Sequence, residues 1–497
     1  MKRILALLFA AAMLFAACGG DDATDEEADG GEETETAETT EATDSEEESD
    51  TDEPDADAEE EGDAEAAGDG ATIEMWIAFS DDARLGFTRD RAAEFSEANP
   101  GYEVVVTEFD SYNTVFEQAQ LAIEDGNPPE IIHFFEAATQ EALDAVDGDG
   151  NPIFTSVTDA IGDRTEILGQ PVVLDDVVSA ATNYYTIDGQ LYSMPWNTSS
   201  TTMFSNMDIL TEAGITEPPA TWADVEAACE AIMALPDAPS EGCITWPNHG
   251  WFYEQSLGQM GVDLVNNDNG RSARATEIFL DSPEAVDYVQ WWSDLEDAGH
   301  YVYTGVQRDW DGTSAAFQAQ NVAMLIYSSS DTTALTQAGD DNGFEVRSSF
   351  MPYNQDVDYE GNLIGGATLW LSNGLSETEQ DGALAFLNYF SNPENAAAWH
   401  QLTGYIPITD SAVSLLEDEG WYDESPNSAV ASEQLDAAAG TPASTGALVG
   451  NFVAIRDVVT AAVEDILVND VDVAERMGSA QTEAQQQLDD YNELFGE

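Results

Sequence analysis

Lysine is almost missing from this chain: among its 497 residues the only lysine is Lys2, and 12 Lys and Arg stand against 100 Asp and Glu. The formal net charge at pH 7 is −88. A surface this negative repels nucleic acid and anionic lipid, which argues against both as partners. The acidic excess is even, as on the solvated surface of a salt-adapted protein, so a single carboxylate says little about catalysis.

Cysteine is also scarce, with 3 in the chain. One of them, Cys18, follows an N-terminal apolar run, which leaves Cys229 and Cys243 as a pair 14 residues apart. This spacing allows one disulfide within a single lobe; two free buried thiols are the alternative. No apolar stretch beyond residue 18 is long enough for a transmembrane helix, so the rest of the chain is expected outside the membrane.

The common catalytic signatures are missing as well. The sequence contains no G-x-S-x-G, H-E-x-x-H, Walker or G-x-G-x-x-G motif, and none of its 4 histidines pairs with cysteine at metal-ligand spacing. Residues 147–151 resemble a calcium loop, but Pro152 stands where that loop requires glycine, so an acidic turn is favoured. We therefore expect no enzyme activity, no cofactor and no metal.

The N-terminus has the pattern of an export signal. Lys2 and Arg3 precede an apolar run over 4–17, which ends in small residues before Cys18. Fourteen residues are too few to span a bilayer, so 1–18 is interpreted as a signal peptide with Cys18 as the lipid attachment point. Ordinary secretion, with cleavage near Ala17, is the alternative.

The segment that follows is acidic and almost without apolar residues. Residues 21–70 contain 26 Asp or Glu and no Lys or Arg. Such a segment repels itself and has nothing to bury, so 19–70 is expected to be a disordered tether. A partner-binding acidic tail is the alternative. The remaining body, 71–497, carries 74 Asp or Glu and 10 Arg.

The body opens with strand and helix patterns in alternation, which predicts an α/β fold with a largely parallel sheet. The expected strands are 72–79, 102–109 and 130–135, and the expected helices are 84–98 and 112–124. Ligands of such sheets bind beyond the carboxyl ends of the strands. This places 79–82, 110–112 and Glu136 on one rim.

The later chain predicts a second lobe and several crossings between lobes. Further helices are expected at 221–235, 283–298, 312–320, 377–390, 393–402, 450–468 and 471–495, and further strands at 322–327 and 362–371. Residues 191–204 mix strand and turn residues, as a crossing would. The bilobal division that results places about 71–195 and 360–385 in lobe 1, and about 198–355 and 386–497 in lobe 2.

Arg456 is conspicuous because cations are so rare. It lies near the start of an apolar helix, in the segment G-N-F-V-A-I-R at 450–456. An arginine in apolar surroundings needs a carboxylate or an anionic ligand. Both remain open from these residues alone.

Four segments resemble the solute-binding proteins of bacterial Ugp ABC importers, which take up sn-glycerol 3-phosphate. The most specific is P-E-N-A-A-A-W-H-Q-L-T-G-Y-I-P-I-T at 393–409, and the others are 195–200, 364–370 and 450–456. The resemblance runs from about residue 72 to the C-terminus. It implies a periplasmic-binding-protein-like bilobal fold and a monomer that delivers its solute to permease subunits, and with the N-terminal signal this monomer is expected to be extracytoplasmic and lipid-anchored at Cys18.

The resemblance also implies a ligand site. Carried over position by position, the binding residues of the family correspond to Tyr112, Glu136, Ser199, Ser328, Gly366, Tyr405 and Arg456. Arg456, the hydroxyls and the backbone at Gly366 would hold a phosphate group, while Glu136 would accept hydrogen bonds from glycerol hydroxyls.

One departure concerns the aromatic wall of the family site. The family often has W-x-G-W; here Trp251 fills the second position, but Asn248 fills the first and Trp246 is displaced. A roomier pocket would accept glycerophosphodiesters such as glycerophosphocholine, whose cationic headgroup Trp246 or Trp251 could face. The rival interpretations are an oligosaccharide-binding protein of the same fold and, less favoured, a surface-anchored hydrolase.

Overall fold

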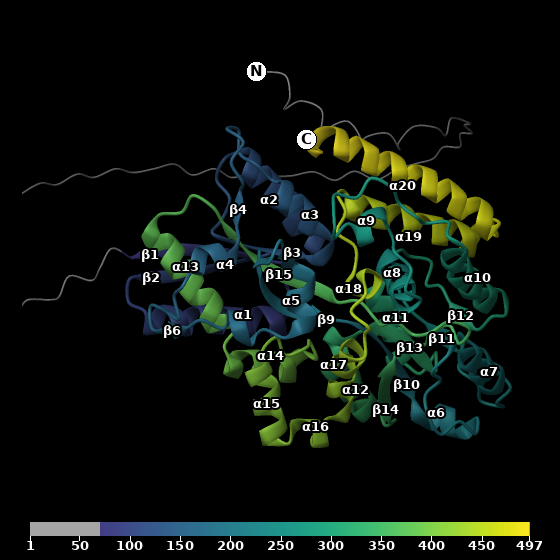
Figure 1. The fold of residues 1–497 in the computed structure, drawn as a ribbon. Helices are drawn as coiled ribbons and strands as arrows, with labels where there is room; N and C mark the ends of the chain where they lie inside the picture. The colour runs from purple at the N-terminus through teal and green to yellow at the C-terminus, as the bar shows by residue number, and fades with distance from the viewer. Residues whose placement is uncertain (1–69, 497) are drawn as a thin grey trace, which may run out of the picture. The chain divides into compact units, whose positions relative to one another are not determined.

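The computed structural model describes residues 70–496. Cys18 and nearly all of the expected tether lie outside the described residues. Within the described part, the core is formed by two β-sheets with helices packed around each (Figure 1). The α/β, periplasmic-binding-protein-like bilobal fold is confirmed.

The first sheet begins as predicted. Its strands β1, β2 and β3 are parallel, and β15 joins β3 antiparallel in the order β2-β1-β3-β15-β4, with β9 also paired to β15. The bounds are β1 Ala71–Ile77, β2 Tyr102–Glu108, β3 Ile131–Phe135, β4 Phe154–Thr155, β9 Met194–Ser199 and β15 Gly365–Ser372.

Polar caps set the starts of the helices around this sheet. Asp81 caps α1 (Asp82–Ala98) and Ser111 caps α2 (Tyr112–Glu124), each accepting a backbone N–H of the first turn. Ser376 and Glu379 form a capping box at the start of α13 (Glu377–Phe390), one of the expected helices. The cap at Ser111 places Tyr112 directly beyond the carboxyl end of β2.

The second sheet has the order β12-β11-β13-β10-β14. Strand β10 is antiparallel to β13 and β14, whereas β11 is parallel to β12 and β13. The bounds are β10 Thr201–Asn206, β11 Ile244–Thr245, β12 Tyr301–Val302, β13 Met324–Ser328 and β14 Val346–Phe350.

One of the crossings between the two sheets takes place at a single residue. Strand β9 ends at Ser199 in the first sheet and β10 begins at Thr201 in the second, so only Ser200 lies between them. The side chain of Ser200 is buried and donates to the carbonyl of Leu363 at 2.9 Å. The predicted crossing over 191–204 is therefore an extended segment shared by both sheets.

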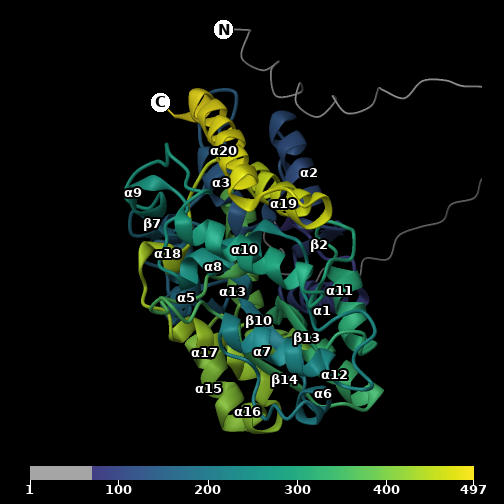
Figure 2. The same cartoon turned by 90° about the vertical axis from the view of Figure 1, so that its right-hand side faces the viewer.

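Two long helices end the described chain and lie side by side in both views (Figures 1 and 2). The first of them, α19, is buried along Ile455, Val459 and Val463. It packs against α8 and approaches the turn that follows β3. The helix bounds on this side are α7 Trp222–Met233, α8 Gly250–Gln259, α10 Pro283–Asp297, α11 Trp310–Gln318, α19 Phe452–Asn469 and α20 Val473–Phe495.

The middle and late parts of the chain add shorter helices. These are α3 Thr139–Asp144, α4 Val157–Ile161, α5 Ser179–Tyr185, α6 Met207–Glu212, α9 Asn266–Asn269, α12 Thr332–Asn342, α14 Pro393–Thr403, α15 Asp410–Glu419, α16 Trp421–Glu424, α17 Val430–Asp436 and α18 Pro442–Thr445. Helix α14 contributes Trp399 to the same apolar core as Ile73 and Leu369 of the first sheet. The lobe boundaries themselves stay a prediction.

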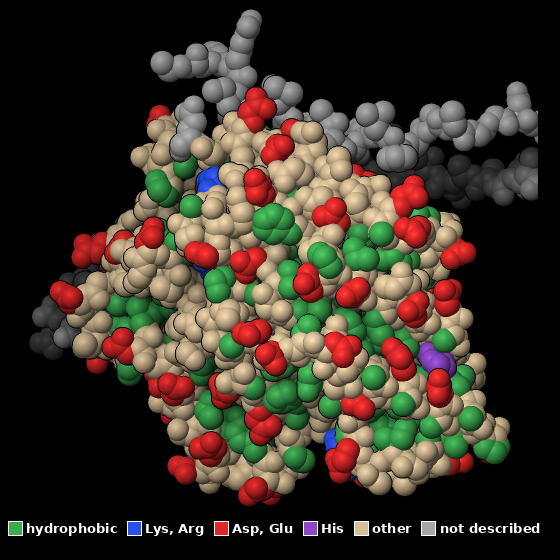
Figure 3. Space-filling view, turned by 45° about the vertical axis from the view of Figure 1, so that its right-hand side comes forward, with side chains coloured by type: hydrophobic (Ala, Val, Ile, Leu, Met, Phe, Trp, Pro, Cys, Tyr) green, Lys and Arg blue, Asp and Glu red, His purple; other side chains and the backbone are tan. Residues whose placement is uncertain are grey.

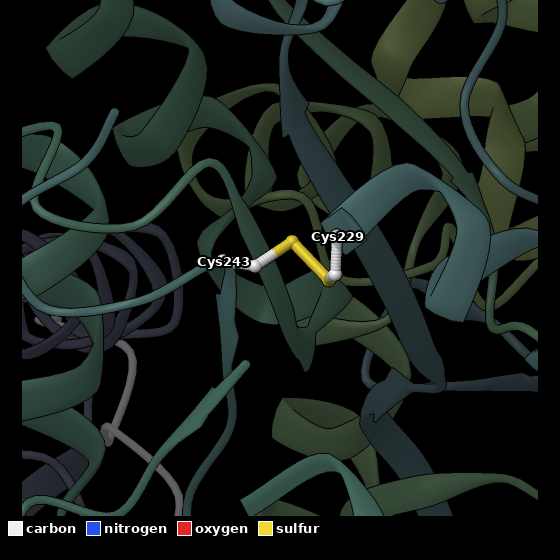
Figure 4. The surroundings of a disulfide bond; sticks show 2 residues. All are labelled: Cys229 and Cys243. Atoms are coloured by element: carbon white, nitrogen blue, oxygen red, sulfur yellow. A yellow bond between two sulfur atoms is a disulfide. The ribbon is translucent and has the colours of Figure 1, made fainter. Parts of the chain in front are cut away.

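Cys229 and Cys243, the pair for which a bridge was expected, are joined by a disulfide (Figure 4). Cys229 lies in α7 and Cys243 directly precedes β11, so the bond ties this helix to the second sheet. Both side chains are fully buried.

The surface reflects the composition. Asp and Glu side chains are scattered over the face shown in Figure 3, between apolar and neutral polar groups, whereas Lys and Arg appear at very few points. Of residues 70–496, no helix combines the length and the apolar character that a membrane crossing demands.

Candidate functional site

Arg456 forms the centre of a buried ion cluster. Its Nε and Nη2 donate to the two carboxylate oxygens of Glu254 at 2.6 and 2.7 Å, and Nη2 also donates to Glu136 Oε1 at 2.6 Å. The three side chains come from α19, α8 and the turn after β3, and each is 6 or 7% exposed. Arg456 and Glu136, both predicted for the ligand site, are thus in direct contact.

The electrostatics of this cluster follow from its burial. Burial alone would lower the pKa of Arg456, but Glu136 and Glu254 raise it above its ordinary value, so the guanidinium stays charged. Burial raises the pKa of Glu254, and Arg456 opposes that shift. The cluster therefore places two carboxyl groups against one guanidinium, so acidic groups are in excess.

The cluster leaves two groups without a partner. Among the described residues, nothing hydrogen-bonds to Nη1 of Arg456 or to Oε2 of Glu136. One of these is a donor and the other an acceptor, so together they fit a ligand that carries both an anionic oxygen and a hydroxyl.

Tyr112 and Tyr405 meet on the first-sheet side of the site. Their hydroxyl oxygens are 3.4 Å apart, although the residues are separated by 293 positions in the chain. Tyr112 stacks on Phe135, whose neighbour in sequence is Glu136, and Tyr405 stacks on Trp399. Tyr112 therefore packs beside the strand end that carries Glu136, and Tyr405 lies next to Tyr112.

The position of Tyr405 is fixed by the end of α14. The chain leaves this helix through Gly404, whose φ of 104° favours glycine. His400 Nδ1 donates to the Tyr405 carbonyl at 2.7 Å, and burial lowers the pKa of His400 to about 4. A neutral imidazole thus holds the loop that presents Tyr405.

Ser199 and Gly366 lie on the paired strands β9 and β15. Gly365 opposes Ser199 and Gly366 opposes Thr198. Gly366 has φ of 89°, and a Cβ there would come within 1.8 Å of the Asn197 carbonyl oxygen. Its glycine identity is required by strand packing, a role additional to the expected approach of a backbone N–H to the ligand.

Ser328 is brought to the same region by the second sheet. It ends β13, opposite Thr201 of β10, and its hydroxyl accepts the N–H of Ser330 at 3.2 Å. The adjacent Ser329 exchanges hydrogen bonds with Ser200. A Cβ on Gly404 would come within 2.5 Å of the Ser329 carbonyl oxygen, so Ser328 and Tyr405 lie on adjoining segments.

The two tryptophans considered for the site separate in the structure. Trp251 belongs to α8, its indole N–H donates to the Ile364 carbonyl at 3.4 Å, and a Cβ on Gly365 would come within 2.2 Å of its ring. Trp246 instead lies in the second-sheet core, 1% exposed and stacked on Trp291. The expectation that Trp246 could face a ligand is wrong, because its ring is enclosed by other aromatic residues.

The acidic turn that resembled a calcium loop is closed by its own hydrogen bonds. The Asp147 carboxylate accepts the N–H groups of Asp149 and Asn151 and the side-chain amide of Asn151. Its oxygens are therefore used within the turn. Over residues 70–496, no cluster of three His, Cys, Asp or Glu side chains could hold a metal ion.

Sequence reasoning missed two residues of this site. Glu254 forms a two-point ion pair with Arg456. Its signal in the sequence was a carboxylate within the apolar segment G-W-F-Y-E-Q-S-L at 250–257, because a buried carboxylate needs a cation as partner. Asn197 is fully buried and donates to the Tyr112 hydroxyl at 2.7 Å. Its signal was its place two residues before Ser199 in the P-W-N-T-S segment.

The fold and the polar site beside the crossing define a binding protein, and the comparison with known families agrees. The chain belongs to the bacterial extracellular solute-binding protein family, whose match covers residues 90–430. It is a substrate-binding protein of an ABC importer.

Sequence relatives show which solute-binding proteins this chain resembles. The chain is 28% identical over 405 residues to the sn-glycerol-3-phosphate-binding periplasmic protein UgpB of Salmonella typhimurium, covering 80% of this chain and 87% of that protein. UgpB of Escherichia coli O1:K1 matches with the same identity and coverage. The resemblance to the Ugp solute-binding proteins is confirmed.

Solved structures of several kinds of solute-binding protein share the fold of this chain. UgpB of Mycobacterium tuberculosis in complex with glycerophosphocholine aligns with a TM-score of 0.68 and 19% identity, covering 85% of this chain and 99% of that one. The cyclic α-maltosyl-1,6-maltose-binding protein of Arthrobacter globiformis aligns with a TM-score of 0.66 and 19% identity, covering 85% of this chain and 100% of that one. These structures support the fold alone.

Proposed function

We propose that this protein binds a glycerophosphodiester with a cationic headgroup, of the kind represented by glycerophosphocholine, and delivers it to a membrane permease. The proposal rests on one observation: the guanidinium of Arg456 is already paired with Glu136 and Glu254. The site is therefore not a free positive pocket, although it retains an unused donor edge on Arg456.

Charge arithmetic separates the candidate ligands. A phosphate monoester such as glycerol 3-phosphate carries about −1.5 to −2 at pH 7 and would add this charge beside two carboxyl groups that share one guanidinium. A phosphodiester carries one negative charge, and a choline headgroup cancels it. Less repulsion at the buried carboxylates therefore favours the zwitterion.

The remaining groups match the rest of such a ligand. Nη1 of Arg456 and the hydroxyls of Tyr112, Tyr405, Ser199 and Ser328 supply donors for phosphoryl oxygens. Glu136 Oε2 supplies an acceptor for a glycerol hydroxyl, and Trp251 supplies an aromatic face for a cationic headgroup. Binding makes and breaks no bond in this scheme.

Calorimetry on the purified body (residues 71–497) tests the proposal. Glycerophosphocholine is expected to bind at least about tenfold more tightly than glycerol 3-phosphate at pH 7.5, which corresponds to about 1.4 kcal/mol. Because the second pKa of a phosphate monoester is about 6, the difference should narrow at pH 5.5. Equal affinities at both pH values would contradict the charge argument.

A neutral oligosaccharide is the second candidate, favoured by the same neutralised Arg456 and by a group of aromatic rings around Trp251. Trp251 and Trp310 have ring centroids 6.4 Å apart, and Trp310 lies 5.0 Å from Tyr327. Maltose serves as the discriminating ligand. Tight maltose binding without any response to phosphodiesters would replace the first candidate with this one.

The N-terminal expectations complete the proposal. We propose that Cys18 is lipidated and that the acidic segment 19–70 tethers a monomeric body near its permease, outside the cytoplasm. Cys18→Ser is expected to abolish incorporation of labelled palmitate and to release the protein into the medium or periplasm. A lipid label that persists in Cys18→Ser would refute the anchor.

A further inference from the structure

A buried chain of hydrogen bonds leads from the backbone of β1's end to the Tyr112 hydroxyl. The N–H of Ala78 points to Nδ1 of His133 at 3.2 Å, and Nε2 of His133 lies 2.7 Å from Oδ1 of Asn197. The side-chain amide of Asn197 then donates to the Tyr112 oxygen at 2.7 Å. His133 and Asn197 are both fully buried.

The first donor fixes the direction of every bond in this chain. A backbone N–H can only donate, so His133 Nδ1 must be an unprotonated acceptor. A neutral imidazole carries its single proton on the other nitrogen, so Nε2 donates to Asn197. Asn197 must then present its oxygen to His133 and its NH₂ to Tyr112, because the flipped amide would set two donors against each other.

The last step determines what Tyr112 offers to a ligand. Its oxygen accepts from Asn197, so its own O–H proton points elsewhere. The nearest hydroxyl is that of Tyr405 at 3.4 Å, which is longer than an ordinary O–H···O bond. Tyr112 is partly exposed, so a ligand oxygen can accept the hydrogen bond from its O–H in place of Tyr405.

We infer that His133 and Asn197 are positioning residues that hold Tyr112 as a hydrogen-bond donor toward a ligand group that accepts, such as a phosphodiester oxygen. A phosphoryl oxygen can only accept, so the Tyr112 O–H suits it, whereas a ligand group that only donates, such as an ammonium, is disfavoured at this position. The inference rests on the proposed function for the identity of the ligand, but the direction of the bonds can be measured without one.

Two independent effects keep the hydrogen-bond chain from Ala78 through His133 and Asn197 to Tyr112, here called the relay, in one protonation state. Burial lowers the pKa of His133 to about 3, so the imidazole remains neutral at physiological pH. Burial, with a smaller effect of Tyr405, raises the pKa of Tyr112 well above its usual value, so its hydroxyl keeps the proton. Around the relay, Phe79 and Trp196 pack on the His133 ring and exclude water.

A double-mutant cycle measures the role of Asn197 in binding. Asn197→Asp keeps the shape of the side chain and the acceptor for His133. Its second carboxylate oxygen, however, accepts a hydrogen bond from the Tyr112 O–H, whereas the Asn197 amide donates to the Tyr112 oxygen. A lost hydrogen bond to a charged group lowers affinity by about tenfold to a hundredfold, which is the loss of glycerophosphocholine affinity expected for Asn197→Asp and for Tyr112→Phe. In the Tyr112→Phe background, Asn197→Asp should cost clearly less, because only the effect of its charge remains.

The cycle has a matched control and a clear failure. Asn388 is also fully buried and also bonds through both ends of its amide, to Val173 N–H and the Leu384 carbonyl, but it lies outside the site. Asn388→Asp should therefore leave the affinity unchanged at whatever cost to stability. Equal losses from Asn197→Asp with and without Tyr112→Phe would overturn the inference.

Nitrogen-15 NMR of the unmodified protein tests the relay even where a variant fails to fold or no ligand binds. The chain has 4 histidines, and His133→Gln identifies the signal of interest by its loss. His133 is expected to be neutral with the proton on Nε2 from pH 8 to pH 5. A proton on Nδ1, or titration near pH 6, would refute the relay, whereas failure of all phosphodiesters to bind would refute only the proposed function.

Discussion

Removal of the Arg456 guanidinium should destabilise the fold much more than removal of an arginine whose acidic partners are exposed to solvent. Arg456→Ala leaves Glu136 and Glu254 buried without a cation, and each is only 6 or 7% exposed. Breaking a buried ion pair from one side costs about 3–5 kcal/mol. The loss arises from the two carboxylates that remain.

Arg476 provides a control of the same residue type with the same number of partners. It contacts Asp465 and Glu483, whose side chains are 44 and 52% exposed. Exposed pairs contribute about 0.2–1 kcal/mol, so Arg476→Ala should cost less than about 1 kcal/mol. Both variants would be compared with the unmodified body by urea denaturation.

Urea is preferable to heat for this comparison. Unfolding entropy is about 2.1 cal/mol/K per residue near 60 °C, or about 0.9 kcal/mol/K over the 427 residues from 70 to 496. A loss of 3–5 kcal/mol would therefore move the thermal midpoint by only about 3–6 °C. The denaturation free energy resolves the same loss more clearly.

The pH dependence of the Arg456→Ala loss identifies its cause. Burial already raises the pKa of Glu254 while Arg456 opposes that shift, so without the arginine its folded-state pKa rises further above the unfolded value of about 4.3. The folded variant then binds more protons than the unfolded chain, so its stability falls as the pH rises and recovers as it drops below about 5. Equal losses for Arg456→Ala and Arg476→Ala, or a loss independent of pH, would refute the reasoning.

Three further predictions concern the disulfide, the crossing strands and a buried histidine. Reduction, or Cys229→Ser with Cys243→Ser, should lower the unfolding free energy by about 3 kcal/mol for a loop of this length; an unchanged urea midpoint in dithiothreitol would contradict it. Gly366→Ala should cost more stability than Gly374→Ala, since both glycines have positive φ but only the Cβ at Gly366 would meet backbone; similar midpoints for the two variants would show that the β9–β15 packing can yield. The pKa of His400 is about 4 in the folded state and about 6.5 when unfolded, so the stability that its neutral form contributes is present above pH 6.5 and is lost as the pH falls toward 4. His400→Gln should remove this dependence, about 1.4 kcal/mol per pH unit, from urea unfolding curves at pH 7, 6 and 5, and parallel curves for the two proteins would contradict it.

The sequence predicted most of the first sheet and the helices that carry clear signals. Strands β1, β2 and β3 alternate with amphipathic, capped helices, and the Ser376 and Thr221 boxes mark helix starts within a residue or so. Helix α8 was missed because all ten of its residues are buried, so it has no polar face and no period of 3.6 to detect.

The site was predictable only where its residues lie in distinctive segments. Tyr112, Tyr405 and Arg456 came from motifs, and the structure brings them into one region. Glu254 was not predictable by composition, because 100 Asp and Glu give no reason to choose one of them. The enclosed position of Trp246 depends on stacking with Trp291, which lies 45 residues away and cannot be inferred from a single sequence.

The crossing at Ser200 has a mechanical consequence for lobe closure. Every polar group of this residue is occupied: it exchanges hydrogen bonds with Ser329, donates to the Leu363 carbonyl and accepts from Gln434. Rotation of its backbone torsions would break several bonds at about 0.5–1.5 kcal/mol each. Ser200 therefore acts as a rigid joint between the sheets, and the bending that opens and closes a solute-binding protein has to be taken up by other connections.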